Sequence, residues 1–448
     1  QTKQSNIHMK RTIILSFFLS WLTANVSAQE VWTLQQCIDY ALNHNISIKK
    51  QKNEIKRLNI ERNNLKSDFL PNLQAGTTQK MDFGRSLNKN NTYDETNAQS
   101  TSLSLSSEIV LFEGLKRFHS IRKNRYDLSA QIAGTEVTRN DLSLNIVSCY
   151  FQILLDIEIA EIARQQVLLT EEQIAKTQFL IDHGKVPHSQ LYDVRAQLAD
   201  DELTVTEAVN TLRLSKLELM QLMELNDTDS FRIVPVRTGN PETVSLLPDE
   251  VYHAALTCMP QIKQAHYKVE SSMKSIAIAR SGYYPSLSLG AGISSGYYHS
   301  DQALNASFGR QLQNNMQKSI YITLSIPLFN RFSTRNEIRT AKVQADNALL
   351  ALEEEKKALY KDIEKAYTDA VSAYEKYEST TRSVEANTEA HRYAQEKYAA
   401  GKSTVFEYNE SKMKLANALS AQAQAKYTCL LKNRILNFYA CRELAGTN

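Results

Sequence analysis

The chain has 448 residues, of which 23% are charged, and a formal net charge of +3. Acidic and basic side chains are interspersed, so no basic face argues for nucleic acid as a partner. There are only 13 glycines and 8 prolines, and this scarcity favours long uninterrupted helices over many short elements.

Residues 1–28 are predicted to be a leader remnant followed by a secretory signal peptide. Residues 1–8 precede the first methionine, 9–11 read Met-Lys-Arg, and 12–22 form an apolar run of 11 residues. A basic start, a short apolar core and small residues before the predicted cut are typical of an exported protein. The apolar run is too short to span a membrane, which takes ~20 residues. No later stretch of the chain reads as a transmembrane helix.

The mature chain is predicted to contain two copies of one unit. Pro71 in "FLPNLQAG" corresponds to Pro285 in "YYPSLSLG", and the Gly-Lys pair at Gly184 corresponds to the pair at Gly401. The corresponding positions are 214 to 217 residues apart, and a nearly constant offset over several elements indicates an internal repeat. The predicted domains are 29–225 and 249–448, joined by a linker at 226–248.

Each copy is predicted to contain the same elements in the same order. A first helix ends at a proline, two short strands follow, and a very long helix turns back into a shorter returning helix. A helix of ~70 residues spans about 100 Å, far beyond a helix of an ordinary globular domain. The predicted helices are 33–69, 113–181 and 188–225 in the first copy, and 249–284, 331–400 and 404–444 in the second.

The strands are predicted from strict alternation of apolar and polar residues. In "SIYITLSIPL" at 319–328, every second residue is Ile or Leu, which indicates a strand with one apolar and one polar face. Similar alternation occurs at 102–111 and 286–293, and the polar segments 84–100 and 300–318 are expected to separate the strands.

The returning helix of the first copy carries a heptad repeat of apolar residues. Such a repeat predicts supercoiled packing against a neighbouring helix. We therefore expect antiparallel coiled-coil pairs that form a long helical body. The heptad positions are Leu191, Leu198, Val205, Leu212 and Leu219.

Four strands with an apolar face cannot stand alone in lipid, because their open edges leave backbone groups unpaired. Spanning barrels start at about eight strands, so several chains would have to share one barrel. The predicted fold class is mainly α with β: a duplicated unit of long antiparallel coiled-coil helices, with four strands contributing to an oligomeric barrel. The alternative is a soluble or peripheral periplasmic coiled-coil scaffold or adaptor, in which the same segments are ordinary half-buried hairpins.

The stretch "YAAGKSTVFEYNE" at 398–410 contains Gly-Lys-Ser-Thr, which looks like the end of a phosphate-binding loop. Such a loop needs a glycine five residues before Gly401 and a strand leading in, but the chain has Glu396 there after a helical stretch. Gly401 is expected to end the long helix in a left-handed conformation. Ser403 or Thr404 is expected to cap the returning helix.

The five cysteines include no C-x-x-C pair. They are expected to be isolated, mostly buried thiols rather than a disulfide framework or a metal site. No catalytic motif or set of metal ligands stands out, so no enzyme activity, cofactor or metal is predicted.

The chain resembles the TolC-like outer-membrane efflux proteins over essentially all of its mature length. The resemblance lies in the strand entries at Pro71 and Pro285, the strand exits "LFEG" and "LFNR" at Phe112 and Phe329, and the turns "FLIDHGKVPHSQLYDV" and "KYAAGKSTVFEY". It implies a homotrimer that shares one twelve-stranded outer-membrane barrel and one periplasmic helical tunnel. It also implies an exit duct of a tripartite efflux or secretion system, coupled to an inner-membrane transporter through a periplasmic adaptor.

The resemblance further implies that the turn at Gly401 lies at the periplasmic tip. Glu407 and Glu410 follow it, three residues apart on one helix face, and family members often carry acidic residues there. If these two and Asp193 point inward, they form an acidic constriction that acts as a periplasmic gate. The alternative is that they are solvated carboxylates on an exposed helix. In the first copy, Gln190 replaces one of the two acids.

Other residues of the tip are weaker candidates. Tyr398 is expected to pack the closed tip or simply the helix end. The turns at Gly184, Lys185, Gly401 and Lys402 are candidates for adaptor contact, with plain solvation of the lysines as the alternative.

Overall fold

The computed structural model describes residues 31–87, 91–95, 97–226, 231–234, 241–243, 245–301 and 306–442. The predicted leader at 1–28 lies outside these residues. The chain divides into two compact units. Unit 1 comprises the described residues within Gln1–Lys49, Thr138–Cys258 and Leu359–Asn448, and unit 2 comprises those within Lys50–Val137 and Met259–Ala358.

Two helices of 67 residues each dominate the secondary structure, α4 (Lys116–Asp182) and α9 (Ser333–Ala399). Each begins and ends within three residues of its predicted bounds. Among the described residues, none of the helices combines the length and apolar character that a membrane span needs.

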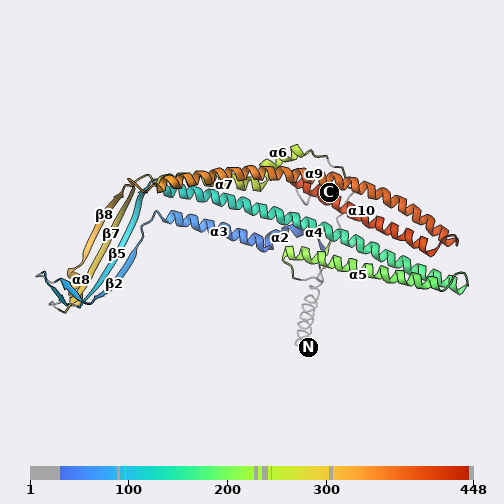
Figure 1. Cartoon of the computed structure of the whole chain (residues 1–448), viewed down its shortest axis with the longest axis horizontal. Coiled ribbons are helices and arrows are strands. Elements are labelled where there is room, and N and C mark those ends of the chain that lie inside the picture. Colours follow the sequence, from blue (N-terminus) through green and yellow to red (C-terminus); the bar gives the residue numbers. More distant parts are fainter. Residues whose placement is uncertain are drawn as a thin grey trace, which may run out of the picture. The chain divides into compact units, whose positions relative to one another are not determined.

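Unit 2 contains a four-stranded antiparallel sheet in the order β2-β5-β7-β8 (Figure 1). The strands are β2 (Gln74–Asp82), β5 (Ala98–Glu113), β7 (Ser286–Ser300) and β8 (Gln317–Ser325). Leu105 pairs with Ile293 and Leu289 with Ile322, so apolar side chains share one face. Serine, threonine and glycine lie on the other face, as the alternation predicts. Strand β8 ends earlier than predicted, because Pro327 cannot donate to a sheet ladder.

The polar segments between the strands contain regular structure that was not predicted. The first segment contains the hairpin β3 (Arg85–Leu87) and β4 (Tyr93–Glu95), and the second contains the short helix α8 (Phe308–Asn314). The side chain of Gln311 in α8 accepts from the backbone N–H of Tyr298 at 2.9 Å and donates to its carbonyl at 2.9 Å. Strand β7 extends beyond its pairing with β8, and α8 pairs the backbone of Tyr298 in that extension.

The first helix of each copy was predicted to be continuous and is broken in the structure. In the first copy, α2 (Leu34–His44) and α3 (Ile46–Ser67) are separated by Asn45, whose ψ is 134°. The Asn45 side chain accepts from the N–H of Ser47 at 2.8 Å and donates to the carbonyl of Leu222 at 3.0 Å. In the second copy, α6 (Pro248–Cys258) and α7 (Pro260–Ser281) are separated at Met259, because Pro260 occupies the first position of α7.

Unit 1 contains two helical hairpins. One joins the end of α4 to α5 (Ser189–Met223), and the other joins the end of α9 to α10 (Val405–Tyr439), each returning antiparallel to its partner (Figure 1). Along α5, Leu191 and Leu219 are buried and the three heptad positions between them are partly buried. The predicted heptad therefore describes the packed face of α5.

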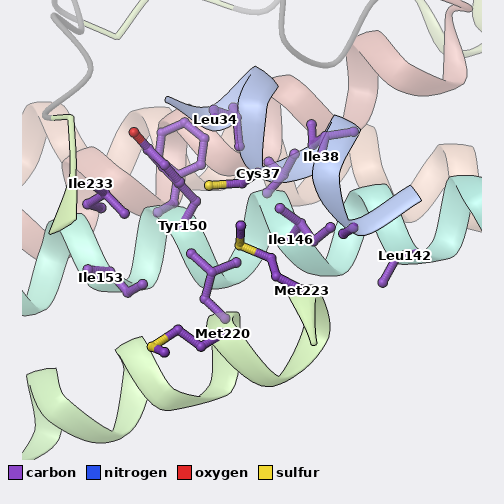
Figure 2. Packing of buried hydrophobic residues seen from close by; sticks show 14 of the residues in the cluster. Leu34, Cys37, Ile38, Leu142, Ile146, Tyr150, Ile153, Met220, Met223 and Ile233 are labelled. Carbon is purple, nitrogen blue, oxygen red and sulfur yellow. The ribbon is translucent and has the colours of Figure 1, made fainter. Parts of the chain in front are cut away.

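The main apolar core of unit 1 is a cluster around Tyr150 of α4. The Tyr150 hydroxyl donates to the carbonyl of Val234 at 2.5 Å, next to the two-stranded pairing of β1 (Val31–Trp32) with β6 (Arg232–Ile233). Complete burial of an aliphatic side chain stabilises a fold by about 1.5–3 kcal/mol, so this cluster joins α2, α4 and α5 firmly. Its members include Cys37 and Ile38 of α2, Ile146 and Tyr150 of α4, and Met220 and Met223 of α5 (Figure 2).

The cysteines differ from the prediction of five isolated thiols. Cys258, the last residue of α6, and Cys441, just after α10, form a disulfide with a Cα–Cα distance of 6.5 Å. Cys37 and Cys429 are buried free thiols and Cys149 is a partly buried one. The bonded pair is 183 residues apart, so sequence spacing could not reveal it; folding of unit 1 brings the two residues together.

Candidate functional site

The turns of both hairpins in unit 1 are helix terminations centred on glycine. Gly184 has φ +68° and Gly401 has φ +70°, in the left-handed region that glycine enters without a steric penalty. The N–H of Lys185 donates to the carbonyl of Leu180, and the N–H of Lys402 to the carbonyl of Lys397, both at 2.9 Å. These bonds belong to a Schellman motif, so the prediction that Gly401 ends a helix is confirmed. Both lysines are exposed.

Glu407 takes part in the cap of α10. Thr404 is the N-cap residue, and its hydroxyl accepts from the N–H of Glu407 at 3.2 Å. The Glu407 carboxylate accepts from the Ser403 hydroxyl at 2.9 Å and from the Thr404 N–H at 3.4 Å. This is a reciprocal capping box, and it gives Glu407 a structural role in addition to its charge.

The other two predicted gate residues lie on exposed helix surface. Glu410 forms an ion pair of 2.7 Å with Lys414, one turn further along α10. Asp193 is exposed on α5. Within the described residues, no hydrogen bond or ion pair joins Asp193 to either glutamate, so one chain alone does not assemble the three carboxylates.

Tyr398 packs between three helices. Its ring stacks on that of Tyr408 in α10, with centroids 5.1 Å apart, and Lys176 Nζ of α4 lies 5.4 Å from its centroid. The Tyr398 hydroxyl is buried and has no hydrogen-bond partner among the described residues. Tyr398 therefore packs the two hairpins together near their turns.

A buried ion pair between the hairpins was not predicted. The Lys412 side chain is 3% exposed, and its Nζ lies 3.0 Å from the Asp201 carboxylate, which is 12% exposed. Lys412 also donates to the Gln166 carbonyl at 3.3 Å and to the Thr170 hydroxyl. One lysine of α10 thus contacts both helices of the first hairpin. The spacing of Val405, Tyr408 and Lys412 places this lysine on the buried face of α10, a signal visible in the sequence.

The packed face of α4 becomes polar toward its turn. Ala160 and Ala163 are buried there, but the next buried positions are Thr170, Gln173 and Thr177. Both amide atoms of Gln173 and the hydroxyl of Thr177 are buried without a partner among the described residues. Thr170, Gln173 and Thr177 form a polar seam. Buried polar groups without a partner cost free energy, so Gln173 and Thr177 stabilise the seam less than apolar side chains would.

His391 of α9 lies beside the polar seam. One ring nitrogen is 3.0 Å from the Ser411 hydroxyl. Burial, and then the positive charge of Lys412, lower the pKa of His391. The neutral imidazole is therefore favoured next to the buried lysine.

The sheet of unit 2 has a wide exposed apolar face. Ile320 is 81% exposed, Ile322 68% and Leu324 59%. Strands β2 and β8 are the outer strands of this sheet, and each has one edge without a strand partner among the described residues. Apolar side chains in water and unpaired strand edges are unfavourable, so this sheet needs a further partner and an apolar surrounding.

Long helical hairpins combined with such a two-faced sheet define a class of outer-membrane channel proteins. The outer membrane efflux protein family matches residues 37–223 and 251–438, which is most of the chain. The chain belongs to this family of outer-membrane efflux channels, whose helical body lies in the periplasm.

Curated relatives are distant but cover most of the chain. Outer membrane protein TolC of Escherichia coli strain K12 is 21% identical over 378 residues, covering 82% of this chain and 74% of TolC. The probable outer membrane lipoprotein SilC of Salmonella typhimurium is 22% identical over 377 residues, covering 82% of this chain and 77% of SilC.

Solved structures share the fold. The CmeC outer membrane channel of Campylobacter jejuni superposes with a TM-score of 0.74 at 18% identity, covering 92% of this chain and 87% of CmeC. The outer membrane protein VceC of Vibrio cholerae superposes with a TM-score of 0.71 at 15% identity, covering 92% of this chain and 96% of VceC.

Proposed function

We propose that three copies of the chain close one twelve-stranded barrel in the outer membrane and that their helical hairpins form one periplasmic tunnel. The observation that supports this proposal is the four-stranded sheet, whose two outer edges have no strand partner in the part of the chain that the structure describes. Joining β8 of one copy to β2 of the next leaves no edge unpaired. In this arrangement the apolar face meets lipid, and the serine- and glycine-rich face lines the channel.

In this proposal the channel is the exit duct of a tripartite efflux or secretion system. An inner-membrane transporter delivers the substrate and supplies the energy, and a periplasmic adaptor connects it to the duct, so the channel itself carries out no reaction. The exposed turns at Gly184, Lys185, Gly401 and Lys402 would contact the adaptor.

The two copies of the unit, 29–225 and 249–448 with the linker 226–248, remain part of the proposal. The order α2-α3, β2, β5, α4, α5 recurs as α6-α7, β7, β8, α9, α10, which supports an origin by duplication.

The deciding experiment is single-channel conductance of the purified mature protein in a planar bilayer, combined with sizing in detergent. A trimer with small, cation-sensitive conductance is expected for a duct with a closed tip. A protein that stays soluble without detergent and never inserts would instead favour the periplasmic scaffold.

The acidic gate gives a prediction for the same assay. Glu407→Gln together with Glu410→Gln should raise conductance and weaken block by divalent cations, because both changes remove negative charge from the constriction. Glutamine at position 407 still completes a capping box, so the helix end is retained.

The matched control for the gate is Thr404→Ala. This variant loses the cap but keeps both charges. Conductance that rises as much in Thr404→Ala as in the double glutamine variant would mean that the helix end, rather than the acidic charge, controls the tip. No change in either variant would leave the carboxylates as solvated surface groups.

A further inference from the structure

The disulfide of unit 1 joins residues at the two ends of the second half of the chain. Cys258 closes α6, and Cys441 follows the last turn of α10. The bond therefore makes a covalent ring of the segment between them, which contains α7, β7, α8, β8, α9 and α10. The bond holds the C-terminal end of α10 at the end of α6.

The backbone around Cys441 has an unusual conformation for its residue type. Cys441 has φ +64°, which favours glycine and is unfavourable for a side chain with a Cβ. Its N–H donates to the carbonyl of Phe438 at 2.9 Å, and the N–H of Arg442 donates to that of Asn437 at 3.0 Å. Cys441 thus occupies the position of a Schellman motif where glycine is usual. A cysteine at a position that favours glycine points to a role for its sulfur.

Contacts other than the disulfide align α6 with its neighbours in unit 1. Val251 and Ala255 are buried, and the Tyr252 ring meets that of Tyr360 edge-on, with centroids 5.2 Å apart. The side chain of Asn433 in α10 donates to the Glu242 carbonyl of the linker at 3.2 Å. These contacts hold α6 against its neighbours in unit 1 independently of the disulfide.

The remaining thiols do not compete for this pairing. Cys37 and Cys429 are buried and Cys149 is partly buried. Burial raises the pKa of Cys37 to about 12 and, with the charge of Glu218, that of Cys149 to about 11. Burial also raises the pKa of Cys429. Thiols that stay protonated attack disulfides poorly, whereas Cys441 is exposed at the surface.

We propose that the Cys258–Cys441 disulfide, called the clasp below, is under redox control. It forms after export, once α6 and α10 have docked, and fixes the C-terminal end of α10. One cysteine, as its thiolate, attacks the disulfide of a thiol–disulfide oxidoreductase and forms a mixed disulfide. The second cysteine then attacks the protein sulfur of that mixed disulfide. The clasp disulfide forms, both S–H bonds are lost, and the two electrons and two protons leave with the oxidoreductase as its dithiol. The inference requires export to an oxidising compartment and is independent of channel activity.

The bond is tested by counting thiols that react with an alkylating agent in the denatured chain. Of the five cysteines, three should react without reduction and all five after reduction by a small-molecule dithiol. A chain expressed without residues 1–28 and kept in the reducing cytoplasm should show five in both conditions. Five reactive thiols in the exported, unreduced protein would overturn the proposal.

Whether the disulfide fixes the end of α10 is tested by hydrogen exchange and thermal unfolding of the exported chain. Cys441→Ser should lower Tm and speed amide exchange at 251–258 and 436–442, because the helix end is released. Cys441→Gly should show the same loss, although glycine relieves the unfavourable φ. Cys149→Ser, the matched loss of an unbonded thiol, should keep the bond and leave exchange at both segments unchanged.

The Cys441→Gly variant distinguishes the effect of losing the disulfide from the effect of relieving the positive φ at position 441. If Cys441→Gly matches or exceeds the wild type in Tm and in exchange protection, the bond does not fix the helix end and the clasp is excluded. Failure of the protein to form channels in a bilayer would leave the clasp standing, because neither readout depends on conduction.

Discussion

At the scale of single residues, Lys412 shows how one buried charge joins two helical hairpins. Its ammonium group is bound by the Asp201 carboxylate of α5 and by Gln166 and Thr170 of α4. Asp201 also accepts from the Gln197 amide at 2.8 Å. Both charges are therefore well provided with hydrogen bonds, which a buried pair needs to offset its desolvation.

Removal of one partner of this pair should be strongly destabilising. Asp201→Asn leaves the Lys412 charge buried without a counter-charge, and we expect a loss of about 3–5 kcal/mol in the free energy of unfolding of unit 1. This loss is measured by urea unfolding in detergent, with hydrogen exchange along α5 and α10 as the readout.

The exposed pair of Glu410 and Lys414 provides the control for that experiment. Its side chains are 50% and 64% exposed, so Lys414→Met should change stability by at most about 1 kcal/mol. Replacing both buried partners, with Asp201→Asn and Lys412→Met, should recover much of the single-variant loss. A double variant as unstable as Asp201→Asn alone would show that the buried lysine charge is not the cause.

At the scale of elements, the joint between α2 and α3 depends on one side chain. Asn45 is 8% exposed and bonds both to Leu222 and to Ser47. Asn45→Ala leaves the Leu222 carbonyl unpaired and removes the cap of α3, so we expect a loss of about 1–3 kcal/mol. Asn43→Ala is the matched change two residues away, because the Asn43 side chain donates to the exposed carbonyl of Asp39 and to no other group among the described residues. Equal Tm values for Asn45→Ala and Asn43→Ala would contradict this role for Asn45.

The elements also show which features the sequence could predict. The long helices were predicted to within three residues because their apolar spacing, their lack of proline and their single glycine, Gly134 of α4, are local properties. The break at Asn45 was not, because it depends on Leu222, 177 residues away. The disulfide was missed for the same reason. The break at Met259 could have been predicted from Pro260, and the burial of Lys412 from its spacing to Val405 and Tyr408. The gate carboxylates remain a prediction, because a single chain does not bring them together.

At the scale of the whole molecule, the two faces of the sheet distinguish a membrane channel from a soluble scaffold. Ile322 and Thr323 are neighbours in β8, but they point to opposite faces, since Ile322 pairs with Leu289 and Thr323 with Ser288. In a barrel, the first meets lipid and the second meets the channel. In a soluble scaffold neither face meets lipid, so the chain and its variants would be recovered outside the membrane fraction.

Lysine substitution at Ile322 and at Thr323 therefore distinguishes the membrane channel from the soluble scaffold. In a barrel, Ile322→Lys should cost about 2–4 kcal/mol per chain near the middle of the lipid face, and a trimer carries this cost three times. We expect the oligomer and its recovery in the outer-membrane fraction to be lost. Thr323→Lys should assemble normally and change only the ion selectivity of the channel, because it adds positive charge to the wall. Equal recovery of both variants as oligomers in the membrane would mean that Ile322 does not face lipid, and equal recovery as soluble protein would favour the scaffold.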